Sequence, residues 1–274
     1  MKAPLPAVRV HARLALRRAT ARARSLPDFL VIGAQRAGTS SLYNALVRHP
    51  LVVRAAVKEV QYFSLFSEKG DGWYRAHFPL RARLRAGQRT GEATPYYLFH
   101  PRAAERAAAV VPEARLVVLL RDPVERAISQ YHFQRRLGFE PLETFEAALD
   151  AEEERLAPEL PRVLDEPGFA GFAHQHFSYV SRGEYAEQLE RWFAVFPRER
   201  FLILESGELW SDPAGSYAKT LAFLGLPPHE LGYPHRNAGD YPEIDPAIRA
   251  RLRDRFAPSN ERLFDLLGRR FDWS

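Results

Sequence analysis

Three short apolar runs stand out along the chain, and each of them ends in a polar turn. They lie at residues 29–32, 115–120 and 201–204. Continuous apolar character over a few residues is typical of strands that are buried on both faces. Weaker strand signals precede Gly91 and cover residues 51–53. The pattern therefore predicts a central parallel sheet.

Apolar residues recur at helical spacing between these runs. Alternating strands and helices are typical of an α/β fold, here a single P-loop-like domain over residues 28–274 with a central parallel sheet flanked by helices. Residues 142–168 are acidic and interrupted by prolines, so we expect a surface excursion there, the best candidate for a mobile lid. The expected helices cover a turn after Gly72 and residues 39–49, 101–110, 123–136, 184–196, 213–224, 246–256 and 260–268.

Composition narrows the possible chemistry. The chain has 274 residues, of which 46% are hydrophobic and 12% aromatic, enough for a sizeable core. It has no cysteine, which excludes disulfides, thiolate catalysis and zinc–thiolate sites. The lack of cysteine fits a reducing compartment, and no apolar run has the length of a signal peptide or a membrane span. We therefore expect a cytoplasmic protein.

The formal charge of +5 favours anionic ligands but is too small to indicate nucleic acid binding. Almost all of the positive charge is arginine, which suits bidentate phosphate or sulfate contacts, although a GC-rich genome explains the bias equally well. Residues 1–27 carry seven basic side chains and no acidic one. We expect a basic N-terminal segment that frays as a helix, in preference to one that contacts anionic lipid or a polyanionic partner.

The first apolar run leads directly into a glycine-containing loop that opens a helix. Such a loop presents backbone N–H groups to a phosphate, and Gly33 and Gly38 let the backbone turn and approach the ligand. An ordinary strand–helix turn with a serine cap is the alternative. The hydroxyl groups at the helix start belong to Thr39, Ser40 and Ser41.

The loop differs from the nucleotide-triphosphate P-loop in one decisive position. Gly33 and Gly38 have the G-x-x-x-x-G spacing of that motif, but Thr39 occupies the place of its lysine. The missing lysine argues against ATP or GTP hydrolysis. A cation lies inside the loop instead, as Arg36, an arrangement that suits a single 5′-phosphosulfate.

A second candidate element begins where the second apolar run ends. Arg121 follows that strand, at the edge where open α/β sheets bind ligands. Ser129 lies eight residues later, two turns into the next helix, where it can face the same crevice. An arginine and a hydroxyl together make a phosphate clamp. Taken alone, Arg-Asp-Pro is also a common way to begin a helix.

Together the two elements resemble those of the family of sulfotransferases that depend on 3′-phosphoadenosine 5′-phosphosulfate (PAPS). Gly33–Ser41 resembles the 5′-phosphosulfate loop of that family, and the stretch from Arg121 to Ser129 resembles its 3′-phosphate element. Residues 58–63, 91–97, 183–192 and 271–273 are similar to segments of the heparan-sulfate-type branch. The resemblance covers roughly residues 28–274 and leaves the basic N-terminus unexplained.

The chain also departs from that branch. Arg36 replaces the usual loop lysine, Gln61 stands where histidine is common, and Ala93 stands where some members have lysine. The cystine-closed loop of secreted animal members cannot form without cysteine. These differences weaken any transfer of heparan specificity, though not of PAPS chemistry.

The resemblance implies a site and a reaction. PAPS is the expected co-substrate, 3′-phosphoadenosine 5′-phosphate (PAP) the product, and no metal takes part. Glu59 is the expected base and Arg36 stabilises charge on the phosphosulfate; His132 is an alternative base. The expected nucleotide contacts are Arg36, Ala37, Gly38, Thr39, Ser40, Ser41, Arg121, Ser129, Arg236 and Asn237.

Other residues are assigned to the scaffold. His174 and His176 are expected to be structural, and the acidic run at 150–154 a solvated helix face. The acceptor is expected to be a saccharide or a glycolipid, on the resemblance alone, and the oligomeric state stays open. Two other function classes compete: a P-loop kinase-like nucleotide-binding protein and a non-catalytic polyanion-binding protein.

Overall fold

A five-stranded parallel sheet forms the centre of the molecule. The computed structural model describes residues 14–230 and 244–273. The strand order is β2-β3-β1-β4-β5, so β1 lies in the middle, between β3 and β4. The predicted α/β class and parallel sheet are confirmed. The strands are β1 (Phe29–Gly33), β2 (Val52–Arg54), β3 (Arg89–Ala93), β4 (Arg115–Leu120) and β5 (Phe201–Glu205).

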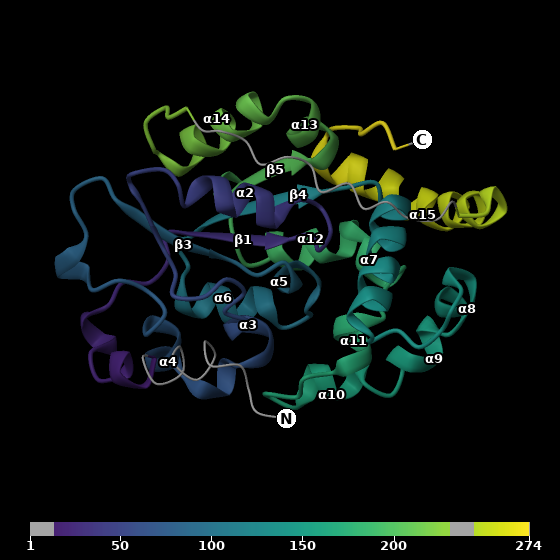
Figure 1. Ribbon diagram of the computed structural model, residues 1–274, viewed down its shortest axis with the longest axis horizontal. Coiled ribbons are helices and arrows are strands. Elements are labelled where there is room, and N and C mark those ends of the chain that lie inside the picture. Colours follow the sequence, from purple (N-terminus) through teal and green to yellow (C-terminus); the bar gives the residue numbers. More distant parts are fainter. Residues whose placement is uncertain (1–13, 231–243, 274) are drawn as a thin grey trace.

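Helices cover both faces of this sheet (Figure 1). One side carries α2, α13 and α14, and the other carries α5, α6 and α12. The helices are α2 (Thr39–Leu46), α3 (Tyr62–Leu65), α4 (Asp71–Arg75), α5 (Tyr96–Phe99), α6 (Ala103–Val110), α7 (Pro123–Leu137), α8 (Phe145–Asp150), α9 (Glu152–Leu156), α10 (Leu160–Asp165), α11 (Phe172–His176), α12 (Tyr185–Phe193), α13 (Ser206–Ser211), α14 (Pro213–Leu224) and α15 (Pro246–Leu267).

The register of the strands sets the position of the candidate motifs. Phe29 of β1 lies opposite Gly91 of β3 and Arg115 of β4. Because all strands are parallel, their carboxyl ends meet at one edge of the sheet. The loops after β1, β3 and β4 therefore emerge side by side. The two phosphate-binding elements predicted from the sequence lie at this edge.

The segment at 142–168 does more than cover the surface. It forms α8, α9 and α10, and Phe145, Ala148 and Leu149 of α8 are buried. These side chains join a second hydrophobic cluster with residues of α7, α11 and α15, such as Ile128 and Phe256. The expectation of a mere surface excursion was therefore incomplete, because the acidic composition hid a short apolar stripe.

One expected helix boundary was wrong. The two helices predicted at 246–256 and 260–268 form a single helix, α15, with Pro258 inside it. A proline removes one backbone N–H from the ladder, but buried side chains on both sides keep the helix packed. These side chains are Phe256 before the proline and Leu263 and Phe264 after it.

The described part of the basic N-terminal stretch packs on the domain. Arg24 is buried, and its guanidinium donates a 2.8 Å hydrogen bond to the carbonyl oxygen of Phe78. Arg17 donates to the same oxygen. The domain boundary at residue 27 stays a prediction. Among the helices that the structure describes, none has the length and apolar character needed to cross a membrane.

Candidate functional site

The loop between β1 and α2 has the geometry of an anion-binding turn. Gly38 is the residue before the helix and has a φ of 96°, in the left-handed region that favours glycine. A Cβ atom at Gly38 would lie 3.1 Å from side-chain atoms of both Leu209 and Trp210. Glycine also has no side chain with which to cap the first amides of α2. Those amides are thus available to a negatively charged group.

Arg36 projects from this loop towards α7. Its backbone φ of 69° is unusual for a residue with a side chain. Its Nε atom donates a 3.1 Å hydrogen bond to Oγ of Ser129, and its guanidinium lies 4.6 Å from the centre of the Phe133 ring. Ser129 is 2% exposed. The two sequence elements, 93 residues apart, therefore meet through these two predicted side chains.

Arg121 makes a second connection between the elements. Its Nη1 atom donates to the carbonyl oxygen of Arg36 at 3.1 Å. The next residue, Asp122, caps α7 by accepting from the amides of Val124 and Glu125, as the Asp-Pro pair in the sequence predicted. Arg36, Arg121 and the amino end of α7 thus form one cationic junction beside the loop.

A cavity of about 560 Å³ opens next to this junction. Arg121 lies on one wall, and the indoles of Trp210 and Trp273 contribute apolar surface. Ser206, also in the lining, donates a 2.7 Å hydrogen bond to the carbonyl oxygen of Ala37, which fixes the cavity to the loop. Its volume falls in the range of small-molecule sites. Its lining combines one cation, Arg121, with four carboxylates, those of Asp122, Glu125, Glu205 and Asp272.

Arg182 contacts the loop between β1 and α2 through the side chain of Gln35. Its side chain is buried; Nη1 donates to Oε1 of Gln35 at 2.5 Å, and Nη2 donates to the carbonyl oxygens of His174 and Gln175. Burial lowers its pKa to about 9. The contact with Gln35 makes Arg182 a support of the loop between β1 and α2.

Glu152 is a residue whose role the sequence did not reveal. The acidic run to which it belongs was expected to be solvated, but Glu152 is 6% exposed. Its carboxylate accepts hydrogen bonds from the amides of Tyr179, Val180 and Ser181 and from the Ser181 hydroxyl. It thereby orders the turn that carries Arg182. Glu152 is buried and not solvated because several hydrogen-bond donors satisfy its carboxylate.

Glu59 lies in the stretch between β2 and α3. Its side chain is 43% exposed and pairs with Nζ of Lys58 at 2.7 Å. Its backbone φ is 59°, again in the left-handed region. The charge of Glu59 also raises the pKa of Arg182, against the larger effect of burial. The Glu59 carboxylate is therefore within electrostatic reach of the group that supports the phosphate loop.

Two of the remaining candidates are histidines, His174 and His132. His174 accepts or donates a 2.6 Å hydrogen bond with the Tyr96 hydroxyl, and burial lowers its pKa to about 2, as befits a structural residue. Burial also lowers the pKa of His132 on α7.

Arg236 and Asn237 lie outside the described residues. Within residues 14–230 and 244–273, no group of three or more histidine or carboxylate side chains could hold a metal ion.

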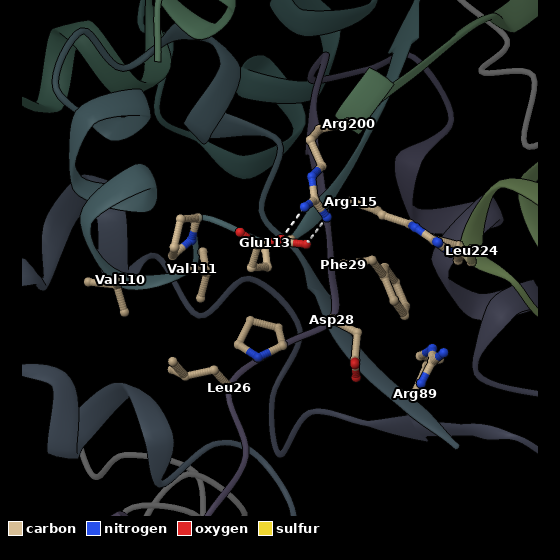
Figure 2. A pocket seen from close by; sticks show the side chains of 13 residues that line it. Leu26, Asp28, Phe29, Arg89, Val110, Val111, Glu113, Arg115, Arg200 and Leu224 are labelled. Carbon is tan, nitrogen blue, oxygen red and sulfur yellow. Dashed lines mark hydrogen bonds and ion pairs between the residues drawn. The ribbon is translucent and has the colours of Figure 1, made fainter. Parts of the chain in front are cut away.

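A second cavity, of about 430 Å³, lies at the opposite edge of the sheet (Figure 2). It is lined by residues at the amino ends of the strands, among them Asp28, Arg89 and Arg115. Figure 2 shows Arg200 and Glu113 paired across it. Ligands of open α/β sheets bind at the carboxyl ends of the strands, so this cavity is separate from the candidate site.

Comparison with known proteins gives this geometry a family. The model of the sulfotransferase domain matches residues 26–233. Heparan sulfate glucosamine 3-O-sulfotransferase 3B1 of Homo sapiens is 31% identical over 91% of this chain and 65% of its own length. Membrane-associated sulfotransferase kil1 of Dictyostelium discoideum is 28% identical over 90% of this chain and 66% of its own. This chain therefore spans about two thirds of the length of these relatives.

The fold agrees with that assignment. A crystal structure of a sulfotransferase from Alicyclobacillus acidocaldarius is 29% identical and similar in structure, with a TM-score of 0.72, over 90% of this chain and 98% of that chain. The match of the domain model extends from the end of the basic stretch through β5 and α14. The chain therefore belongs to the sulfotransferase domain family.

Proposed function

We propose that this protein is a PAPS-dependent sulfotransferase that transfers a sulfuryl group to a hydroxyl or amine of a carbohydrate acceptor. The observation that carries the proposal is the junction of Arg36 with Ser129 and Arg121. It joins a glycine-containing loop, suited to a 5′-phosphosulfate, to a second cationic element suited to a 3′-phosphate. Two separate phosphate elements fit PAP better than they fit a triphosphate chain.

The proposed reaction assigns one task to each group. The acceptor oxygen or nitrogen attacks the sulfur atom, the bond between sulfur and the bridging phosphate oxygen breaks, and PAP leaves with the electron pair. Glu59 takes the proton that the acceptor loses. Arg36 and the first amides of α2 stabilise the charge that grows on the leaving phosphate. Arg121 and Ser129 hold the 3′-phosphate.

A saccharide or glycolipid acceptor is supported by two considerations. Relatives about 30% identical carry names that specify heparan sulfate glucosamine as their substrate. Two aromatic rings are also exposed near the carboxyl end of α7: Phe172 on α11, 49% exposed, and Phe139 after α7, 40% exposed, with ring centres 5.6 Å apart. Exposed apolar surface of this kind marks binding sites, and a sugar ring presents a matching C–H face.

Two alternatives are tested by the same measurements. A P-loop kinase would bind ATP with magnesium, but Thr39 stands where its lysine would be. A polyanion-binding protein would need no ordered phosphate loop. No feature of the described residues favours either, and a cytoplasmic location remains part of the proposal.

The deciding experiment is calorimetric titration with PAP, with adenosine 5′-phosphate and with ATP–Mg²⁺, followed by a PAPS turnover assay on a panel of saccharide acceptors. We expect PAP to bind at least tenfold more tightly than the other two nucleotides, and turnover with a saccharide. Tighter binding of ATP–Mg²⁺ would establish the kinase-like alternative. Absence of nucleotide binding would leave the polyanion-binding alternative.

A further inference from the structure

The stretch that carries Glu59 is fastened to the end of β3 by successive backbone amides. Four successive N–H groups, those of residues 59–62, all find acceptors in residues 92–97. The hydrogen bonds run from Glu59 N to Ala93 O (3.1 Å), Val60 N to Glu92 Oε2 (3.3 Å), Gln61 N to Thr94 Oγ1 (3.4 Å) and Tyr62 N to the Tyr97 hydroxyl (2.8 Å). Three of these four acceptors are side chains.

Glu92 sets the direction of this network. Its side chain is fully buried, and each carboxylate oxygen accepts two hydrogen bonds. The hydroxyls of Thr94 and Tyr97 donate to it, at 2.7 and 3.0 Å. With Tyr74 and the Val60 amide, these hydroxyls partly offset the burial that raises the pKa of Glu92. Their oxygen lone pairs are then left to accept from backbone amides. Tyr74 donates the fourth hydrogen bond, at 2.8 Å, but contacts no amide of residues 59–62.

These hydrogen bonds hold two residues of the stretch in an unfavourable backbone conformation. Glu59 and Gln61 both have a φ of 59°, in the left-handed region that costs a residue with a side chain about 1–2 kcal/mol. Such conformations persist only where surrounding contacts determine them, and they occur at functional sites. Two such residues on either side of Val60 turn the chain so that Glu59 reaches solvent while Val60 is buried.

We propose that Glu92, Thr94 and Tyr97 form a clamp that positions Glu59 for proton transfer, with Glu92 as its central positioning residue. The proposal rests on the proposed role of Glu59 as the base. The clamp binds no substrate itself. It acts through the amides of residues 60–62 and fixes the backbone from which the exposed Glu59 carboxylate projects.

The clamp is separate from the nucleotide elements. Its hydrogen bonds stay among residues 59–62, 74 and 92–97, and in the described ranges none of them reaches the loop after β1 or the amino end of α7. Loss of the clamp should therefore slow transfer without weakening nucleotide binding. Loss of a residue that only supports the fold would instead lower stability and would affect transfer and nucleotide binding together.

The structure offers a matched pair of variants to test this. Tyr97→Phe and Tyr74→Phe each remove one buried hydroxyl from the same oxygen of Glu92, but only Tyr97 holds an amide of the Glu59 stretch. We expect Tyr97→Phe to lower kcat about 10- to 100-fold, with the affinity for PAP within twofold of wild type. Hydrogen exchange at the Tyr62 amide should accelerate in this variant and stay protected in Tyr74→Phe.

A second pair guards against misfolding. Thr94→Val removes the acceptor of the Gln61 amide, and Thr94→Ser keeps it, so the serine variant should restore the turnover that the valine variant loses. Unchanged exchange and unchanged kcat in both Tyr97→Phe and Thr94→Val would overturn the clamp. Equal loss of turnover in Tyr97→Phe and Tyr74→Phe, in step with stability, would also overturn it.

The role of Glu59 is tested separately, so the two failures can be distinguished. Full turnover in Glu59→Gln would remove the base and with it the purpose of the clamp, whatever the exchange data show. Loss of turnover in Glu59→Gln, together with normal exchange in the Tyr97→Phe variant, would keep the base and discard the clamp. Loss in Glu59→Gln with fast exchange in Tyr97→Phe supports both.

Discussion

Arg182 donates a hydrogen bond to Oε1 of Gln35 across 2.5 Å, joining the turn Ser181–Gly183 to the loop between β1 and α2, 147 residues earlier. The turn is itself held by the buried carboxylate of Glu152. A chain of contacts therefore runs from the excursion to the loop. Residues of the excursion, far from the loop in sequence, thus help to fix its conformation.

We expect Arg182→Lys to destabilise the protein and to weaken PAP binding. Lysine cannot serve Gln35 and the carbonyl oxygens of His174 and Gln175 at once, because it lacks the planar fork of arginine. Loss of a buried charged hydrogen bond typically costs about 1.5–3 kcal/mol. Urea unfolding and calorimetry measure the two effects.

The matched control is Arg200→Lys. Arg200 pairs with Glu113, whose side chain is 81% exposed, at the far edge of the sheet. An exposed pair contributes little, so stability should change by at most about 1 kcal/mol and PAP binding not at all. If Arg182→Lys were as mild as this control, Arg182 would not support the loop.

Removal of Arg36 or Ser129 should separate the two phosphate contacts. Arg36→Ala should slow transfer, because the transition state loses the roughly 2–4 kcal/mol that a cation or donor contributes at the group that gains charge. Ser129→Ala should instead reduce the preference for PAP over adenosine 5′-phosphate. Turnover and paired titrations measure these effects. Wild-type turnover in Arg36→Ala, or an unchanged preference in Ser129→Ala, would contradict the assignment.

Glu59→Gln should abolish most of the transfer while leaving nucleotide binding intact. Glutamine keeps the shape of the side chain but cannot accept the proton, so turnover should fall by about 10²–10⁴. Melting temperature and PAP affinity should stay near the wild-type values. His132→Asn is the comparison variant: a collapse of turnover in His132→Asn alone would move the base to α7.

The folded excursion should loosen at acid pH through Glu140. Burial alone would raise the pKa of Glu140, but hydrogen bonds from Arg155, Tyr179 and the Leu142 amide outweigh it and hold the pKa below its usual value. A depressed pKa contributes stability above the unfolded value of about 4.3, and this is lost as the pH falls through the folded pKa.

The measurement is the difference in unfolding free energy between wild type and Glu140→Gln. We expect a clear difference at pH 7 that shrinks as the pH drops below about 4. Glu166→Gln provides the control, because its ion pair with Arg162 is exposed on both sides. A difference for Glu140→Gln that did not depend on pH would show that its charge is not what anchors the segment.

Phe172→Ala should affect the acceptor and not the nucleotide. If the exposed ring contacts a sugar, its removal raises KM for a saccharide acceptor several-fold while the affinity for PAP stays unchanged. Val195→Ala, which truncates another exposed apolar side chain at 38% exposure, should alter neither. An unchanged KM in Phe172→Ala would place the acceptor elsewhere on the surface.

Local sequence signals predicted most of the sheet and the pairing of its two phosphate elements. The strands at 29–32, 115–120 and 201–204 and the start of α7 at Asp122 depend on neighbouring residues, and such features can be recognised in one stretch of sequence. Arg36 and Ser129 were singled out from the glycine-containing loop and from the helix after Arg121, the family resemblance gave them roles, and the structure adds that they touch.

The parts that sequence reasoning missed are buried charges with distant partners. Glu152 looks like its acidic neighbours, and only the amides of residues 179–181 distinguish it. Glu92 likewise looks like any acidic residue at the end of a strand, until Tyr74 and Tyr97 are seen around it. Burial of a charge is decided by tertiary contacts, and these leave no local pattern.

The position of β1 between β3 and β4 divides the proposed chemistry between two neighbours. On one side, β4 leads to Arg121 and the groups that would hold the nucleotide. On the other, β3 leads to Glu92 and the groups that fasten Glu59. Substitutions in the segments after β2 and β3 can therefore move the proposed base without altering the groups after β1 and β4 that would hold the nucleotide. The strand order thus separates the proposed base from the proposed nucleotide site, so that each can change while the other stays in place.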